Sequence, residues 1–281
     1  MSYFDKEHLL NVNYGTTDDY YERSLAWDKF QNEKINVVDK ALKYLDFGKD
    51  KVILDAGCGL GRFSLAAAEL MTKNSKIFAV DISQSMLNIV DTKAKNNDFN
   101  IETINCSIEK LPFSDEYFDE IYCNLVLYHV EDIEFALAQL KKSLKKEGKI
   151  IFLVPEFRWL TELIDWQDRA LLSLGYKYDD ILLAPTGTDR FCKDNANLFI
   201  SKIFNIEKII EHNGSMTFPT SQEILDYYSH SMRFKNVIAR DHAPKYDVLL
   251  NKVHALILDQ YPTGINIPLS SYSYIYYCNR S

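Results

Sequence analysis

The chain has 281 residues, of which 47% are hydrophobic and 26% charged, a composition typical of a soluble globular protein that can bury a full core. Its formal net charge of −8 argues against a nucleic-acid partner, because proteins that follow phosphates carry a basic face. Its five cysteines are scattered and form no C-x-x-C pair, which argues against a disulfide framework and a zinc site.

The N-terminal residues 1–8 lack the basic and then apolar pattern of a signal peptide. No apolar run in the chain approaches the roughly 18 residues that a membrane-spanning helix needs. We therefore expect a cytoplasmic protein with no membrane partner. Residues 1–30 are polar and aromatic with little periodicity, whereas apolar residues from Ile35 to Leu45 have helical spacing, and Gly48 ends that helix.

Strands and helices alternate regularly from residue 51 onward. Short apolar strands that alternate with helices predict right-handed crossovers and a parallel sheet covered on both faces. In such sheets, ligands bind at the carboxyl ends of the strands. The predicted strands are 51–55, 76–81, 101–105, 120–125 and 149–154, and the predicted helices are 63–71, 85–94 and 133–144. The polar residues at or just after these strand ends are Asp55, Asp81, Ser107 and Asn124.

Positive charge is concentrated at residues 141–146, where Lys141, Lys142, Lys145 and Lys146 lie close together. These lysines fit the C-terminal end of the predicted helix 133–144, because cations there complement the helix dipole. We prefer this interpretation to a nucleic-acid patch, since no longer basic stretch interrupts the acidic character of the chain.

The second half of the chain, residues 156–281, is less regular. Thr220 or Ser221 precedes a predicted helix with Glu223 in its first turn, which is the pattern of an N-cap. Residues 271–278 alternate like a final strand beside a sixth strand at 205–212. No repeat or low-complexity linker interrupts the chain, so we expect one domain over residues 1–281. Further predicted helices are 159–174, 195–204 and 247–259, the last within a helical insertion at about 213–262.

In residues 52–62, an apolar strand ends at Asp55, and glycines at alternate positions then let the backbone approach a ligand closely. The dinucleotide fingerprint G-x-G-x-x-G would need a third glycine where this chain has Arg62. The pattern D-x-G-x-G-x-G instead resembles the first motif of class I S-adenosylmethionine (SAM) dependent methyltransferases. A strand–helix turn without a ligand is the alternative. The resemblance implies that SAM contacts Asp55, Gly57, Cys58, Gly59, Gly61 and Arg62.

Asp81 ends the second predicted strand, and a carboxylate there can accept two hydrogen bonds from ribose hydroxyls. The alternative is that Asp81 caps the following helix, a role that Ser83 could fill equally well. We expect Ile82 and Met86 to pack on the adenine ring of the cofactor, although apolar residues at these positions also suit a core.

Residues 107–119 resemble the family's acid-aliphatic-x-x-Leu-Pro-Phe segment, in which the acid and the next backbone N–H bind the adenine edge. Ser107 stands where the family has the acid, and a hydroxyl accepts a hydrogen bond more weakly than a carboxylate does. Ile108 supplies the next N–H. The fourth strand resembles the family segment under the methionine part of SAM, which places Asn124 and Leu125 near the amino-acid end of the cofactor.

These motifs span about residues 50–155, and their order most resembles the ubiquinone-biosynthesis-like (type 11) small-molecule methyltransferases. The resemblance implies an α/β, Rossmann-like, doubly wound seven-stranded sheet that is mostly parallel, with an antiparallel last strand. A helical lid would be inserted between strands six and seven. Within the single domain, residues 1–48 would form an N-terminal lid and first helix, 49–155 the SAM-binding core and 156–281 the substrate-side half.

The resemblance also implies an enzyme that transfers a methyl group from SAM, by in-line displacement, to an O or N atom of a small organic acceptor, with S-adenosylhomocysteine as the product. Because SAM supplies the reactive methyl group, we expect no catalytic triad and no metal. A tRNA or rRNA methyltransferase is one alternative. A non-catalytic SAM-binding scaffold or regulatory protein is another, which Ser107 leaves open. We expect a monomer or a homodimer.

Candidates also lie outside the cofactor motifs. Tyr14 and Tyr21 belong to the segment that often closes over SAM in this family, where aromatic rings can stabilise the sulfonium charge. The alternative is that they pack at the edge of the core. His129, just past the fourth strand, is the candidate general base. The residues predicted to contact the acceptor are Tyr128, His129, Tyr227, Tyr228 and Arg233, although apolar residues at helical spacing are more often core.

Overall fold

The computed structural model describes residues 7, 9–14, 17–48, 50–177 and 187–280. The contacts between residues divide the chain into two compact units. The helical unit contains Met1–Lys34, Phe157–Asp189 and Asn213–Tyr272, and the sheet unit contains Ile35–Glu156, Arg190–His212 and Ser273–Ser281. The expectation of a single domain over residues 1–281 stays a prediction. No helix among the described residues is long and apolar enough to cross a membrane.

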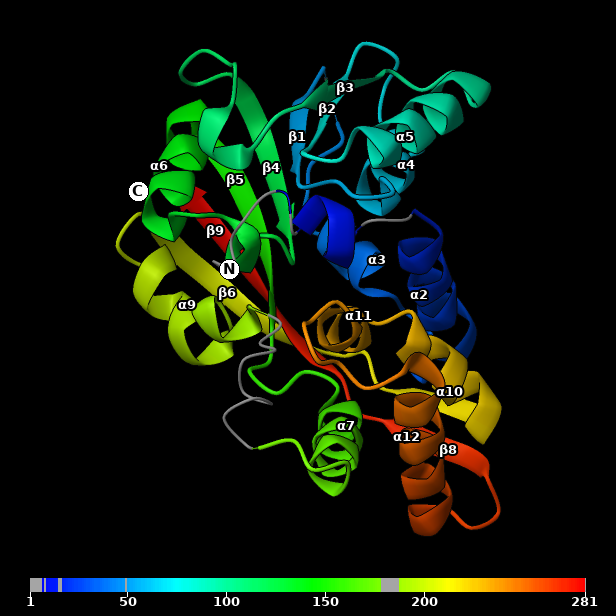
Figure 1. The fold of residues 1–281 in the computed structure, drawn as a ribbon. Coiled ribbons are helices and arrows are strands. Elements are labelled where there is room, and N and C mark those ends of the chain that lie inside the picture. The colour runs from blue at the N-terminus through cyan, green and yellow to red at the C-terminus, as the bar shows by residue number, and fades with distance from the viewer. Residues whose placement is uncertain (1–6, 8, 15–16, 49, 178–186, 281) are drawn as a thin grey trace. The chain divides into compact units, whose positions relative to one another are not determined.

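The sheet unit is built on a seven-stranded sheet with the order β3-β2-β1-β4-β5-β9-β6 (Figure 1). β1 pairs in parallel with β2 and β4, β2 with β3, and β4 with β5, whereas β9 is antiparallel to β5. This arrangement confirms the predicted α/β fold and its antiparallel last strand. The strands are β1 Val52–Ala56, β2 Lys76–Asp81, β3 Ile101–Asn105, β4 Phe118–Asn124, β5 Leu144–Pro155, β6 Phe204–Asn213 and β9 Tyr272–Arg280.

Helices cover both faces of this sheet. Apolar side chains of α6 and α9 pack on one face, and those of α3 and α4 pack on the other. Side-chain caps begin three of these helices: Asn36 accepts from an N–H of α3, Ser83 from one of α5 and Asp132 from one of α6. The elements are α3 Val37–Leu42, α4 Arg62–Ala68, α5 Gln84–Asn96, η2 Ile108–Lys110, η3 Leu127–His129, α6 Ile133–Ser143 and α9 Lys193–Ile200.

The helical unit has its own apolar core and a two-stranded antiparallel sheet, β7 with β8. Thr220 caps α10, as predicted, and its hydroxyl accepts from the N–H of Glu223 at 3.2 Å. The sequence interpretation did not include the two-stranded sheet or α2. The elements are η1 Leu9–Asn13, α2 Thr17–Phe30, α7 Thr161–Ser173, β7 Met216–Thr220, α10 Ser221–Ser229, α11 Met232–Ile238, α12 Tyr246–Gln260 and β8 Ile265–Leu269, with η4 Thr188–Arg190 at the border with the sheet unit.

Candidate functional site

A turn of three left-handed glycines joins β1 to α4 at the carboxyl edge of the sheet. The φ angles of Gly57, Gly59 and Gly61 are 75°, 52° and 73°. The N–H groups of Gly57 and of the buried Cys58 both donate to the carbonyl of Val80 on β2, at 2.8 and 2.9 Å. A Cβ on Gly57 would lie only 2.5 Å from a methyl carbon of Val126. The turn itself therefore requires glycine, and it leaves bare backbone beside the segment that follows β4.

The carboxylate of Asp55 joins β1 to α4. Its side chain is buried, and one oxygen accepts hydrogen bonds from the N–H and the hydroxyl of Ser64, at 3.2 and 2.6 Å. Burial raises the pKa of Asp55 to about 7, although the bonds from Ser64 oppose this shift. Asp55 therefore fixes the strand relative to the helix. Its predicted contact with the cofactor, like that of the half-buried Arg62, stays a prediction.

We expect Asp55 to make stability depend on pH. Its pKa is about 7 in the folded chain and about 3.9 in an unfolded one. The protonated form therefore favours the fold at low pH, and that stability is lost as pH rises through 7. The loss is on the order of 4 kcal/mol relative to Asp55→Asn, which stays neutral. Because the loss begins at the unfolded pKa, urea unfolding of both proteins from about pH 4 to pH 8 measures it, and parallel curves would contradict it.

Asp81 connects the glycine turn to the start of α5. One carboxylate oxygen accepts from the N–H of Gly59 and the other from the N–H of Ser83, both at 2.9 Å. The hydroxyl of Ser83 caps the helix, so Asp81 is not needed for that role. Burial raises the pKa of Asp81, and these backbone N–H groups lower it in turn. The two oxygens together offer about four acceptor positions, so the carboxylate can still accept from a ligand.

The apolar residues beside Asp81 differ in burial. Ile82 is half-buried, whereas Met86 is 2% exposed and so belongs to the interior of the sheet unit. A side chain that is nearly enclosed by protein offers a ligand little surface. Ile82 is therefore the better placed of the two to meet an adenine ring, and both contacts stay predictions.

Ser107, which stands where the family has an acid, lies beside the carboxylate of Glu109. It caps η2, and its hydroxyl donates to a carboxylate oxygen of Glu109 at 3.1 Å. The other oxygen of Glu109 accepts from the N–H of Asp132 at 2.9 Å. Ile108 between them is buried. A half-buried carboxylate therefore lies beside the position where the family has its acid. The sequence interpretation passed over Glu109, because only the turn at η2 brings it back toward Ser107.

Asn124 carries an unmatched acceptor at the end of β4. Its Oδ1 atom is buried, and no hydrogen-bond donor meets it among the residues that the structure describes. Leaving a buried acceptor unpaired costs about 1–3 kcal/mol. The next residue, Leu125, has φ of 48°, a left-handed conformation that is rare without glycine. The unmatched oxygen leaves room for an N–H donor of a ligand at this strand end, and the contacts of Asn124 and Leu125 with SAM stay predictions.

We expect Asn124→Leu to uncouple binding from stability. Leucine removes the unmatched oxygen, so the free energy of unfolding should stay equal or rise by about 1 kcal/mol. The same change removes an acceptor from the site, so SAM binding should weaken about tenfold. Thermal unfolding without ligand and calorimetry with SAM measure the two effects. A loss of stability together with intact binding would reject the assignment of Asn124 to a ligand.

The segment after β4 carries the candidate base. Tyr128 and His129 lie in η3 with ring centroids 4.2 Å apart, and His129 is half-buried whereas Tyr128 is buried. The guanidinium of Arg190 donates to three carbonyls of this segment, those of Tyr128, Val130 and Glu131. Arg190 therefore holds the segment in place. Nothing in the sequence marks it, because it follows Tyr128 by 62 positions.

We expect Arg190→Met to loosen the segment that carries His129. Methionine has a similar length but no donors, and it leaves three carbonyls without their shared partner. The free energy of unfolding should fall by about 1–3 kcal/mol, and hydrogen exchange should quicken at residues 128–131. Arg169→Met is the matched control, because Arg169 is half exposed and forms a 3.8 Å surface pair with Asp259. Equal effects in both variants would contradict this role.

The remaining candidates belong to the helical unit. Tyr14 packs against Tyr20, with the guanidinium of Arg23 over both rings. Tyr21 is 46% exposed, whereas Tyr227 and Tyr228 are buried. The hydroxyl of Tyr228 donates to the buried Gln167 at 2.8 Å. These contacts account for Tyr228 as a core residue, and the binding roles of Tyr14, Tyr21, Tyr227, Tyr228 and Arg233 stay predictions.

Residues 54–152 match the family of methyltransferase domains, which confirms the resemblance indicated by the sequence motifs. A demethylmenaquinone methyltransferase of Bacillus pumilus is 28% identical over 116 residues, which are 41% of this chain and 50% of that protein. A ubiquinone/menaquinone biosynthesis C-methyltransferase of Paraburkholderia phymatum is 27% identical over 189 residues, which are 66% of this chain and 70% of that protein. The chain spans about half the length of the Bacillus relatives.

Solved structures share the fold at low sequence identity. A putative methyltransferase from Bacillus halodurans is 14% identical with a TM-score of 0.59, over 86% of this chain and 98% of that chain. The cyclase SpnF is 16% identical with a TM-score of 0.57, over 89% of this chain and 86% of that chain. Because proteins of different names share this fold, the similarity shows the architecture and not the reaction.

Proposed function

We propose, from the match of residues 54–152 to methyltransferase domains, that this chain transfers a methyl group from SAM to a small organic acceptor. One observation carries the proposal. The carboxylate of Asp81 and the unmatched Oδ1 of Asn124 lie at the carboxyl ends of β2 and β4, on either side of β1 and its bare glycine turn. Ligands of parallel sheets bind at this edge.

The donors and acceptors at this edge fit the parts of SAM. Asp81 can accept from the ribose hydroxyls, and Oδ1 of Asn124 can accept from the amino group of the methionine part. The carboxylate of Glu109 beside Ser107 supplies the acidic acceptor that the adenine amine requires. When bound, SAM supplies an electrophilic methyl group on a sulfonium. The chain then has to orient the acceptor in line with that methyl group and exclude water, which is worth roughly 7–11 kcal/mol in well-oriented reactions.

Two observations bear on the atom that accepts the methyl group. The sequence predicts an O or N nucleophile, for which His129 is the candidate base. The relative from Paraburkholderia phymatum is named a C-methyltransferase, which supports carbon as a second candidate. SAM labelled with ¹³C in its methyl group distinguishes the three, because the ¹³C chemical shift of the new methyl group depends on the atom that carries it.

Calorimetry with SAM and with S-adenosylhomocysteine tests the cofactor. Saturable heat with both is expected, and no heat with either rejects the proposal. Labelled SAM incubated with metabolite extracts then tests for transfer. Binding without any labelled product would favour the non-catalytic scaffold, and labelled tRNA or rRNA would favour the nucleic-acid alternative.

A further inference from the structure

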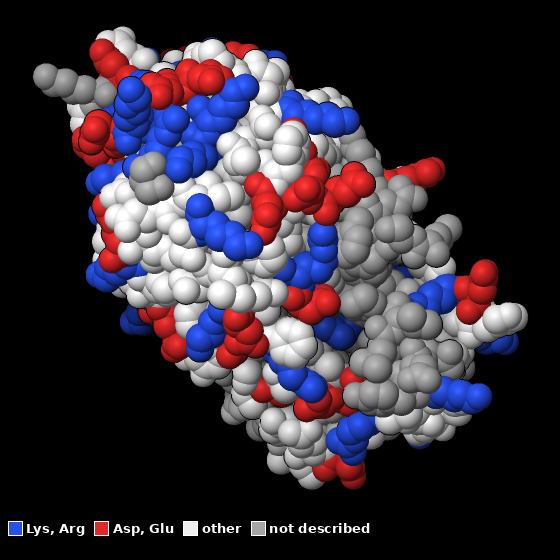
Figure 2. All heavy atoms as spheres, turned by 90° about the vertical axis from the view of Figure 1, so that its left-hand side faces the viewer, with Lys and Arg blue, Asp and Glu red and all other residues white. Residues whose placement is uncertain are grey.

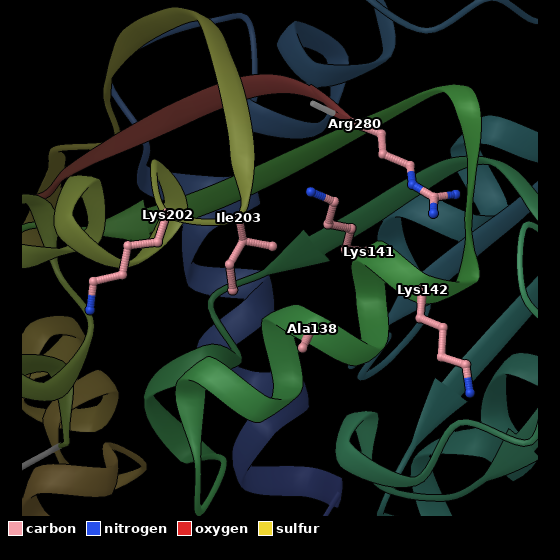
Figure 3. Close-up of a pocket in the computed structure, with 6 residues that line it drawn as sticks. All are labelled: Ala138, Lys141, Lys142, Lys202, Ile203 and Arg280. Carbon is pink, nitrogen blue, oxygen red and sulfur yellow. The ribbon is translucent and has the colours of Figure 1, made fainter.

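A pocket with a volume of about 350 Å³ lies in the sheet unit at the amino edge of the sheet, opposite the strand ends of the candidate site. Three segments that are far apart in sequence meet there: the end of α6, the end of β9 and the turn between α9 and β6 (Figure 3). The residues that line it are Ala138, Lys141, Lys142, Lys202, Ile203 and Arg280.

Positive charge is concentrated at this pocket although the whole chain is acidic. Four of its six lining residues are cationic, in a chain with a net charge of −8. Figure 2 shows the side of the molecule that carries α6 and α9, with Lys and Arg side chains gathered in one area and acidic side chains at its border. The dipole of α6 explains lysines in its last turn, but it does not explain cations from the other two segments.

Lys142 and Lys202 form ion pairs with exposed acidic side chains. Lys142 pairs with Asp115 at 3.3 Å, and Lys202 pairs with Glu134 at 2.6 Å. All four side chains are more than half exposed, and exposed pairs of this kind contribute little to stability. In Figure 3 the side chain of Lys202 points away from the other cations, as its pair with Glu134 requires. A ligand with several negative charges can therefore displace these acids at low cost.

Arg280 is held more firmly than the lysines. Its side chain is 22% exposed, and one guanidinium nitrogen donates to the carbonyl of Leu144 at 2.7 Å and to Glu116 at 3.0 Å. A guanidinium has five donors in a rigid fork, so these bonds fix its position without using all of its donors. A fixed guanidinium beside exposed ammonium groups is suited to phosphate.

We propose that this pocket binds a ligand with phosphate groups that carry at least two negative charges, held by Lys141, Lys142, Lys202 and Arg280 beside the apolar Ala138 and Ile203. The site is separate from the candidate SAM site and does not depend on the proposed function. The phosphate can belong to a soluble ester or to a lipid headgroup, which share this chemistry.

Calorimetry of the full chain with inorganic pyrophosphate tests the site at low salt. We expect saturable binding that weakens with added salt. The double variant Lys142→Gln/Lys202→Gln should weaken it about tenfold, since each lysine gives a charge-assisted contact. The matched control is Lys29→Gln/Lys95→Gln, which removes the same charge from two exposed, acid-paired lysines outside the pocket. Absence of saturable binding, or an equal loss in the control, would overturn the proposal.

Removal of the acids that pair with Lys142 and Lys202 gives a second, independent test of pyrophosphate binding. Asp115→Asn/Glu134→Gln releases Lys142 and Lys202 from their acids, so pyrophosphate should bind several-fold more tightly. The control Asp91→Asn/Glu223→Gln releases Lys95 and Lys29 in the same way and should have no such effect. SAM affinity should stay unchanged in every variant. Cosedimentation with vesicles of phosphatidylcholine and phosphatidic acid assigns the phosphate to a lipid if the chain pellets, and to a soluble ester if it does not.

Discussion

Asp81→Ala is expected to weaken SAM binding at least tenfold, which corresponds to about 1.4 kcal/mol. Both oxygens of Asp81 accept from backbone N–H groups that border the site, those of Gly59 and Ser83. In the complex we expect the same oxygens to accept from the ribose hydroxyls, and hydrogen bonds to a charged acceptor are worth about 1.5–3 kcal/mol each. Calorimetry with SAM and with S-adenosylhomocysteine measures the loss.

A loss of binding could also come from a displaced glycine turn, because Asp81 holds that turn. A 2′-deoxy analogue of S-adenosylhomocysteine separates the two causes. If Asp81 acts through the ribose, the variant and the wild type should differ less for the deoxy analogue than for the natural compound. Asp91→Ala is the control, since Asp91 is an exposed carboxylate on α5 that pairs with Lys95. An unchanged affinity for SAM in Asp81→Ala would remove Asp81 from the site.

The sheet could be predicted because its signals are local. β1, β2 and β4 are short, largely buried strands that end at a turn or a polar residue, and the observed β2 and β3 have the predicted bounds, 76–81 and 101–105. The antiparallel last strand, predicted at 271–278, is observed as Tyr272–Arg280. Strands that are buried on both faces consist almost entirely of apolar residues. Such strands can therefore be recognised in the sequence without knowing which strands pair with them.

The missed elements lack a local signal. α2 buries only Ala26 among its residues, so it shows no apolar stripe at helical spacing. β7 and β8 are short, each contains a proline, and they pair across a separation of about fifty positions, as in Met216 with Leu269. Pairing of that kind depends on tertiary contacts and is not encoded by the propensity of either segment.

The candidate site also contains features that the sequence predicts and contacts that it does not. The left-handed glycine turn could be predicted from spacing and residue type, because only glycine readily adopts that conformation; the cofactor-binding roles of the turn and of Asp81 stay predictions. Glu109 and Arg190 could not be assigned, since the first acts through a turn back to Ser107 and the second through carbonyls on a distant segment. Contacts made by backbone carbonyls leave no trace in the identity of the residues that supply them.

Gly57→Ala is expected to destabilise the chain and to weaken SAM binding, because a Cβ at this position has no room in the turn. Alanine at φ of 75° costs about 1–2 kcal/mol through backbone strain. Its Cβ would also lie 2.5 Å from Cγ2 of Val126, and relief of such a clash costs a further 1–3 kcal/mol, roughly. Val126 follows Asn124 and Leu125, so any shift moves the strand end where we place the amino group of SAM. Binding should fall by at least about 100-fold.

Gly175→Ala is the control that separates backbone strain from the steric clash of the added Cβ with Val126. Gly175 has φ of 90°, yet a Cβ there would meet nothing within 4 Å, so this variant should show only the strain, about 1–2 kcal/mol in urea unfolding, with SAM affinity unchanged. Adding Val126→Ala to Gly57→Ala removes the methyl carbons of the collision and should restore part of the stability. If Gly57→Ala instead lost no more stability than Gly175→Ala and still bound SAM normally, neither the close approach to Val126 nor the contact of this turn with a cofactor could be maintained.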